Sequence, residues 1–155
     1  MMKRFFTILT AALLIVAALT ACSGAKSKDL KAIMDKINTD QQLTGLKQIE
    51  STDDLNRYYQ IEAASVKQFA AELSSSATDY TEIILIEAVD QSAADSIKKQ
   101  LDLRLRNQLS NAKSYAANQV AMIEACEAKE TGSFVTLVIG DKHAEMEATV
   151  AEALK

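Results

Sequence analysis

The sequence has few of the residues on which common catalytic and nucleotide-binding motifs depend. It contains four glycines and one histidine among 155 residues. The four glycines form neither of the glycine-rich loops that cradle phosphates, G-x-G-x-x-G and G-x-x-x-x-G-K-[ST], and no G-x-S-x-G nucleophile elbow is present. A Ser–His or Cys–His catalytic unit would have to use His143. We therefore expect a protein that is not an enzyme and that binds no cofactor.

Positive charge is scarce as well. The sequence has 17 Lys and Arg residues against 21 Asp and Glu residues, a formal net charge of −4. Lys3 and Arg4 lie in an N-terminal segment without acidic residues, so the chain after residue 21 has 15 basic and 21 acidic residues and a net charge of −6. An acidic chain without a basic stripe gains little from a phosphate backbone, and we expect no nucleic-acid partner.

The first 21 residues have the parts of a bacterial export signal. Met1 to Arg4 is a short positive segment, and Phe5 to Leu19 is an uncharged, mostly apolar run of 15 residues. This run is at the upper end for a signal peptide and is shorter than the roughly 20 residues that span a bilayer. We expect residues 1–21 to be a signal peptide that is removed after export.

Four residues close this segment and resemble the lipobox of bacterial lipoproteins: Leu19, Thr20, Ala21 and Cys22. In that family the cysteine thiol accepts a diacylglyceryl group, and the signal peptide is cut just before it. The resemblance implies a lipid on Cys22 that anchors the protein in the cell membrane, facing the extracytoplasmic side. The alternative is an ordinary secretory signal that has a cysteine near its end by chance.

The second cysteine is consistent with this interpretation. An acylated Cys22 cannot pair with Cys126, so we expect no intramolecular disulfide. Cys126 lies in an apolar stretch and is expected to be a small buried residue, with a reactive thiol as the alternative. Residues 22–27 would be the lipidated cysteine and a short tether. Its five residues after Cys22 reach at most roughly 15–18 Å and would hold the domain close to the membrane.

Residues 28–155 are expected to form a single domain that begins with helices. Apolar residues recur at positions i, i+3, i+4 and i+7, the stripe of an amphipathic helix, in Leu30, Ile33, Met34 and Ile37. Ser27 is the expected N-cap. We predict a loop for residues 38–52 and then a short helix that is capped by Thr52 and ends near Ile61.

A strand–strand–helix unit is expected next. Residues 80–89 are rich in β-forming residues with apolar groups on both faces, which predicts a central strand. Residues 66–73 fit either a helix or a strand, and we favour a hairpin of 68–74 with 81–88. The longest helix is expected over about 92–114, with a capping box from Ser92 to Asp95.

A second unit of the same kind is expected after the long helix. Residues 120–127 and 134–139 are predicted to form a hairpin with Gly132 in its turn, followed by a C-terminal helix capped near Asp141. Short links between paired strands favour an antiparallel sheet. The sequence therefore predicts a two-layer α+β domain, with about four antiparallel strands and helices on one face, in a ββα-ββα pattern after the N-terminal helices.

The order of these patterns resembles the small lipoproteins of Firmicutes that carry a DUF4358 domain. The resemblance is carried by the lipobox, by Asp29 to Ile37, by Tyr59-Gln60-Ile61, by Thr81 to Asp90 before the long helix, and by Gly132 to Ile139. It covers nearly all of the chain after the lipobox. The family has no established activity, so the resemblance implies no catalytic residues.

Two further groups of residues are candidates for function. Asp141, His143 and Glu147 could hold a metal ion, but we favour a solvated helix start and expect no metal site. Tyr58 and Tyr59 could form an exposed aromatic patch for a partner. We favour the alternative, in which one ring lies in the core and the other at its edge.

These observations predict a membrane-anchored lipoprotein whose domain is a non-enzymatic extracytoplasmic interaction or binding module. Its expected partners are the membrane, through the lipid on Cys22, and an envelope protein. The alternative function is a small cell-envelope hydrolase or metal-dependent enzyme, which would need a cleft that holds His143 or a cluster of acids. A two-lobed solute-binding lipoprotein would need a longer chain.

Overall fold

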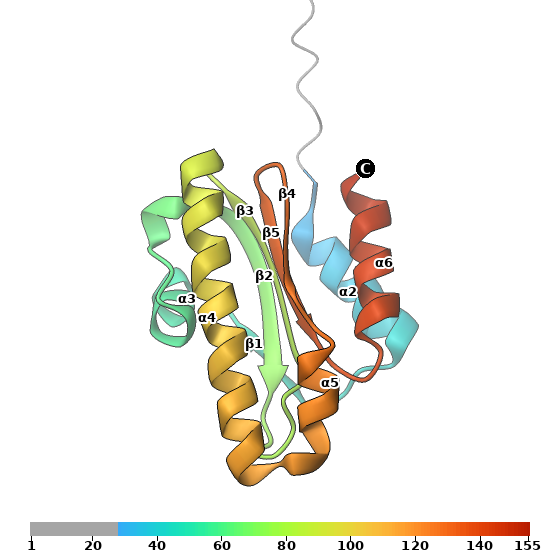
Figure 1. Ribbon diagram of the computed structural model, residues 1–155. Coiled ribbons are helices and arrows are strands. Elements are labelled where there is room, and N and C mark those ends of the chain that lie inside the picture. Colours follow the sequence, from blue (N-terminus) through green and yellow to red (C-terminus); the bar gives the residue numbers. More distant parts are fainter. Residues whose placement is uncertain (1–27) are drawn as a thin grey trace, which may run out of the picture.

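The computed structural model describes residues 28–155, which form helices around a single five-stranded sheet (Figure 1). Every neighbouring pair of strands is antiparallel, and the strand order is β1-β2-β3-β5-β4. The strands are β1 (Leu46–Ile49), β2 (Val66–Ser74), β3 (Glu82–Ala88), β4 (Ala128–Thr131) and β5 (Phe134–Ile139). The predicted signal peptide (1–21) and tether (22–27) lie outside the described residues.

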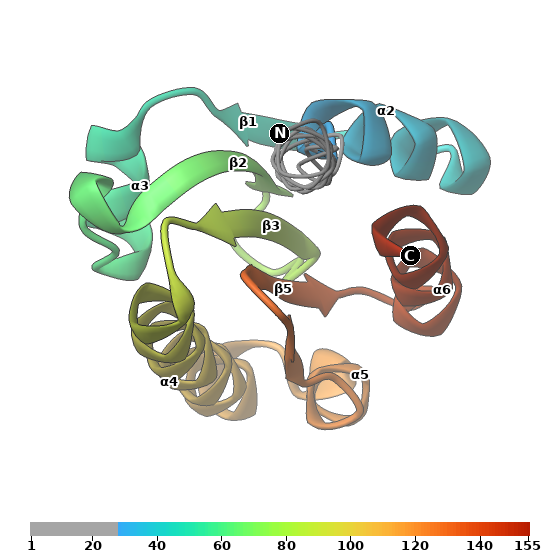
Figure 2. The same ribbon diagram turned by 90° about the horizontal axis from the view of Figure 1, so that it is seen from above.

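Helices cover both faces of this sheet (Figure 2). One face is covered by α3 (Thr52–Tyr59), α4 (Gln91–Tyr115) and α5 (Val120–Glu124), and the other by α2 (Leu30–Gln41) and α6 (His143–Leu154). The α+β class and the ββα-ββα order are confirmed. The predicted two layers with helices on one face are wrong, because helices cover both faces and the domain has three layers. The sheet has five strands where about four were expected.

The central strand β3 explains why three layers are needed. All of its residues are buried, and they alternate between two separate cores. Ile84 and Ile86 pack toward α3 and α4, whereas Ile83 and Leu85 pack toward α2 and α6. A strand with apolar side chains on both faces cannot leave one face in water, so the stripes of α2 and α6 cover the second face.

The helices α2, α3 and α4 begin where an acidic or hydroxyl side chain accepts hydrogen bonds from their first N–H groups. The carboxylate of Asp29 accepts hydrogen bonds from the N–H groups at the start of α2, and Asp90 does the same for α4. The predicted capping box at Ser92 is therefore wrong, and Ser51, not Thr52, caps α3. The side chain of Asp141 does not cap α6, which begins two residues later without a side-chain cap.

Two further predictions fail where elements are short. The expected loop at 38–52 contains the edge strand β1, whose middle residues Lys47 and Gln48 are exposed and give no apolar alternation. The expected strand at 120–127 is instead the single turn of α5, and β4 begins at Ala128.

The hairpin of β2 with β3 is confirmed, so residues 66–73 are a strand. Gly132 turns the β4–β5 hairpin with a φ of 58°, as predicted.

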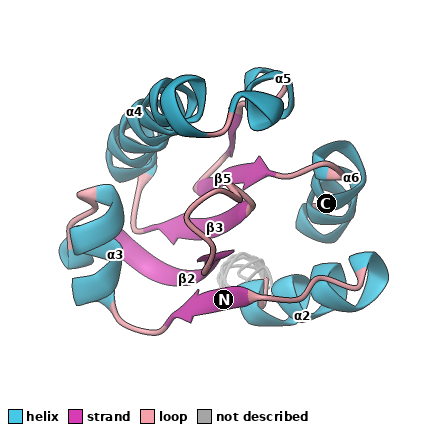
Figure 3. Cartoon of the chain, turned by 90° about the horizontal axis from the view of Figure 1, so that it is seen from below, coloured by secondary structure: helices cyan, strands magenta, loops and turns pink. Residues whose placement is uncertain are grey.

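The described chain begins and ends at the same end of the sheet (Figure 1). The β4–β5 turn and the C-terminus lie at this end, which we call the proximal end. Lys28 lies there too, because the amide of Gln68 contacts both its carbonyl and Glu87 near the end of β3. The loop between β2 and β3, residues 75–81, lies at the opposite end, which we call the distal end. The C-terminal end of α4 lies there as well (Figures 1 and 3). Within residues 28–155, no helix is both long enough and apolar enough to cross a membrane.

Candidate functional site

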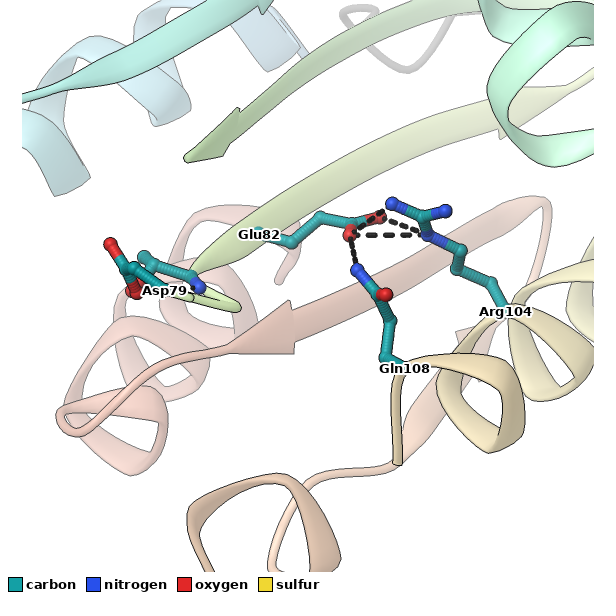
Figure 4. A network of polar contacts seen from close by, with 5 residues as sticks. Asp79, Glu82, Arg104 and Gln108 are labelled. Carbon is teal, nitrogen blue, oxygen red and sulfur yellow. Dashed lines mark hydrogen bonds and ion pairs between the residues drawn. The ribbon is translucent and has the colours of Figure 1, made fainter. Parts of the chain in front are cut away.

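A buried carboxylate lies at the distal end of the central strand. Glu82 is the first residue of β3 and is 1% exposed. A charged side chain is seldom buried this completely unless it is paired. Its oxygens accept hydrogen bonds from Nε of Arg104 at 3.0 Å, from Nη2 of Arg104 at 2.8 Å and from Nε2 of Gln108 at 2.8 Å (Figure 4). The burial of Glu82 is thus compensated by a two-pronged arginine contact and an amide.

The sequence of α4 places both donors on one side of the helix. Arg104 and Gln108 are four residues apart, so their side chains project from neighbouring turns toward the start of β3. The guanidinium group of Arg104 also lies over the ring of Tyr59 from α3, 5.3 Å from its centroid. The three residues and Glu82 therefore join α3, α4 and β3 in one polar network, which we call the distal network.

Raised pKa values fix the protonation states of Arg104 and Tyr59. Burial lowers the pKa of Arg104, but the hydrogen bonds and negative charge of Glu82 outweigh it and leave that pKa above its ordinary value. Burial, and then the charge of Glu82, raise the pKa of Tyr59 well above its ordinary value. Arg104 thus remains charged and Tyr59 remains protonated at neutral pH. Such groups can position and recognise a ligand, but they are poorly suited to proton transfer.

A pocket of about 210 Å³ opens beside this network at the distal end, and we call it the distal pocket. The β2–β3 loop and α4 form its walls, and Glu82 lies at its inner side. Hydroxyl, amide and carboxylate side chains line it: Ser74, Ser76, Asp79, Thr81, Gln108 and Asn111. No Lys, Arg or His lines the distal pocket. The lining therefore combines these polar groups with the side chains of Leu73, Ala77 and Tyr80, and it carries no positive charge.

Asp79 is the exposed carboxylate of the distal pocket. Its Oδ1 accepts hydrogen bonds from the N–H of Thr81 at 3.0 Å and from the hydroxyl of Thr81 at 2.7 Å. Partial burial acts to raise the pKa of Asp79, but the hydrogen bonds from Thr81 and Ser74 outweigh it and lower that pKa. Figure 4 shows Asp79 and Arg104 on opposite sides of Glu82. Asp79 therefore stays ionised in a loop that its own hydrogen bonds hold in shape.

A second polar group surrounds the proximal end of β3. Glu87 is buried and pairs with Lys67, and Nε2 of Gln68 donates to a carboxylate oxygen of Glu87. The same amide donates to the carbonyl of Lys28 at 2.6 Å, while its oxygen accepts the N–H of Leu30 at 3.3 Å. This proximal network fixes the start of the described chain to strands β2 and β3.

The structure does not assemble the metal ligands that the sequence offered as an alternative. A ring nitrogen of His143 lies 3.1 Å from the carbonyl of Gly140, Glu147 pairs with Lys129 at 2.8 Å, and Asp141 is exposed. Within residues 28–155, no group of three or more His, Cys, Asp or Glu side chains is placed to hold a metal ion.

The structure confirms the predictions for Cys126 and for the tyrosine pair. Cys126 is buried, its thiol contacts the carbonyl of Met122 at 3.2 Å, and burial raises its pKa, which disfavours the reactive thiolate. Tyr59 is buried in the core, whereas Tyr58 is half-buried at the edge of the same core. The predicted lipid-attachment residue Cys22 and the rest of the lipobox, Leu19 to Ala21, lie outside the described residues.

Sequence reasoning missed the distal network. Glu82 stands at the start of an apolar run, where a polar residue also fits the end of a strand, and 21 acidic residues offer many pairs by chance. The spacing of Arg104 and Gln108 is visible in the sequence, but polar residues four apart are usual on the solvated face of a helix. These side chains come together only because α4 packs against the start of β3.

The sequence matches the model of a known protein family. The family model for the domain of unknown function DUF4358 matches residues 39–140, well over half of the chain. The matched region contains β1 to β5 and the residues of the distal network and distal pocket. No curated protein and no solved structure matches. The chain belongs to the DUF4358 family.

Proposed function

We propose that this protein is a lipoprotein anchored on the extracytoplasmic side of the cell membrane, and that its domain is a non-enzymatic module that binds an envelope protein at the distal end. The observation that carries this proposal is the position of the distal pocket, at the end of the sheet opposite Lys28. A site placed there would point away from a membrane to which the N-terminal side of the chain is attached.

The attachment rests on the lipobox from Leu19 to Cys22 and on the short segment that follows it. Five residues separate Cys22 from Lys28, whose carbonyl accepts a hydrogen bond from Gln68. A tether of this length keeps the proximal end within roughly 15–18 Å of the lipid. The proximal network thus supports a domain with a preferred orientation, in which the distal pocket faces outward.

Binding, rather than catalysis, is favoured by the character of the distal network. Glu82 is paired with Arg104, and raised pKa values keep Arg104 charged and Tyr59 protonated, so these two groups can hold the pocket wall rigid without exchanging protons. A preformed wall lowers the entropy that a partner must lose on binding.

The anchor is tested by fractionation of cells that produce Cys22→Ala. The wild-type protein should be found in the membrane fraction, and the variant should be released to the medium or remain as uncleaved precursor. A variant that still appears as mature membrane protein would contradict the anchor.

The binding role is tested by placing a photo-crosslinking amino acid at two exposed positions in living cells. Ser76 lies in the β2–β3 loop at the distal pocket, and Thr39 lies on α2 on the other side of the sheet. One recurrent protein partner from position 76, and none from position 39, is expected. Equal products from both positions, or none from either, would contradict binding at the distal end.

A further inference from the structure

We infer that the distal pocket receives a lysine side chain from a basic segment of the partner protein. This inference rests on the proposed function, because it names the group that the distal end recognises. The chemistry of the pocket, its size and the charge of the chain each point to such a group.

The lining of the distal pocket offers mainly hydrogen-bond acceptors. Gln108 uses its amide nitrogen on Glu82, which leaves its carbonyl oxygen for a ligand. Asp79 is ionised at the rim, and no Lys, Arg or His among the lining residues offsets its charge. The charge of Glu82 is already paired with Arg104. A ligand that donates hydrogen bonds and is positively charged matches these groups, whereas an anion would meet Asp79 without a cation to balance it.

The size and the apolar part of the distal pocket favour a long side chain over a larger ligand. About 210 Å³ is below the roughly 300–1,000 Å³ of pockets that hold drug-sized molecules. Leu73, Ala77 and Tyr80 contribute apolar surface to the lining. Lysine combines an aliphatic stem with a terminal ammonium group, so its stem can cover the apolar surface while the ammonium group reaches the acceptors.

The net charge of the chain favours a basic partner. The chain after residue 21 carries a net charge of −6. A surface of this sign attracts positively charged segments during diffusion and repels acidic ones. A basic polypeptide segment therefore fits both the distal pocket and the domain around it.

The inference is tested by NMR titration of the full chain, purified from whichever cell fraction contains it. The probe is N-acetyl-lysine amide, and the matched probe without an ammonium group is N-acetyl-norleucine amide. Lysine amide should shift the backbone signals of Asp79, Thr81 and Asn111. Norleucine amide should bind more weakly, by up to about fivefold, since an exposed ion pair contributes at most about that factor.

Two variants locate the contact. Asp79→Asn keeps an oxygen for Thr81 but removes the charge, and it should weaken binding of lysine amide by up to about fivefold. Asp35→Asn removes the same charge from the exposed side of α2 and should leave binding unchanged. Equal weakening by both variants would show a general charge effect and would overturn the inference.

The remaining outcomes separate this inference from the proposed function. If glucosamine shifts the same signals at lower concentration than lysine amide, an amino sugar is the better ligand and the lysine assignment is overturned. If neither probe shifts them, the assignment is also overturned, while the photo-crosslinking result from position 76 still stands or fails by itself. If the protein binds lysine amide but is found outside the membrane fraction, the proposed anchor is contradicted and the assignment of the distal pocket is supported.

Discussion

Glu82 and Glu87 are both buried carboxylates of β3, but the structure pairs them in different ways. They are five residues apart, so they project from opposite faces of the sheet, at its distal and proximal ends. Glu82 pairs with Arg104, whose side chain is 21% exposed. Glu87 pairs with Lys67, whose side chain is 55% exposed. One strand thus carries a well-shielded ion pair at one end and a solvent-screened pair at the other.

This difference assigns the two carboxylates different structural tasks. The attraction between two charges grows as water is excluded, and so does the penalty when one of them is removed. The contact of Glu82 with Arg104 fixes the long helix α4 against the sheet, and Glu82 itself lines the distal pocket. Glu87, with Gln68, instead fixes the point where the chain enters the domain.

The largest effect is expected when Glu82 loses its charge and its hydrogen-bonding oxygens. Glu82→Leu leaves the guanidinium group of Arg104 largely buried without its carboxylate, and it should lower the free energy of unfolding by about 3 kcal/mol. Urea denaturation followed by circular dichroism measures this change.

The double variant Glu82→Leu/Arg104→Leu is the control for this result. It removes both charges and replaces them with apolar side chains, so it should recover most of the lost stability. A double variant that is no more stable than Glu82→Leu would show that the loss comes from packing at position 82 and not from an unpaired charge.

A smaller effect is expected at the amide partner of the same carboxylate. Gln108→Leu removes one hydrogen bond to Glu82 but leaves the contact with Arg104 intact, and it should cost about 1.5 kcal/mol. Urea denaturation again provides the measurement, with Asn107→Leu on the exposed side of α4 as the matched substitution. A loss at position 108 no larger than that at position 107 would show that the amide does not contribute to the distal network.

The corresponding change at the proximal end should be smaller still. Glu87→Gln removes the charge but keeps an oxygen for Gln68, and its ion-pair partner Lys67 is mostly solvated, so the loss should be below about 1 kcal/mol. Local opening of the chain around Leu30 should be favoured more than global unfolding, because the proximal network holds Lys28 and Leu30. Hydrogen exchange of the amide of Leu30 should accelerate, while the amides of α4 keep their protection. Faster exchange in α4 would contradict separate tasks for the two ends.

The same contrast shows how far the sequence predicts the structure. The stripe of α2, the β2–β3 hairpin and the glycine turn at Gly132 follow from local spacing and residue type, and the structure confirms them. The helical layer of α2 and α6 does not follow from local spacing, because it depends on how β3 is covered on both faces. The edge strand β1 does not follow either, because it forms by backbone pairing without an apolar pattern.

The distal network was beyond prediction for a related reason. Glu82 and Arg104 are 22 residues apart in the sequence, and their contact depends on the angle at which α4 crosses the sheet. The lipobox, by contrast, is local, so the prediction for Cys22 rests on the sequence and stays a prediction. Local patterns therefore predict an attachment signal and located most of the elements, while the pocket needed the tertiary arrangement.

The smallest effect is expected from Asp79, which is exposed at the distal pocket. Its pKa is lowered in the folded protein, so the fold favours the ionised form. The resulting stability is fully present above the pKa of Asp79 in the unfolded chain and is lost as the pH falls through the lower pKa of the folded state. Asp79→Asn removes this contribution, and the midpoint of urea denaturation should therefore fall less between pH 5 and pH 3, values chosen to bracket the ordinary pKa of aspartate at about 3.9, than it does in the wild type. Asp35→Asn should retain the wild-type decrease, and an Asp79→Asn variant that also retains it would show that the hydrogen bonds of the β2–β3 loop do not hold this carboxylate ionised.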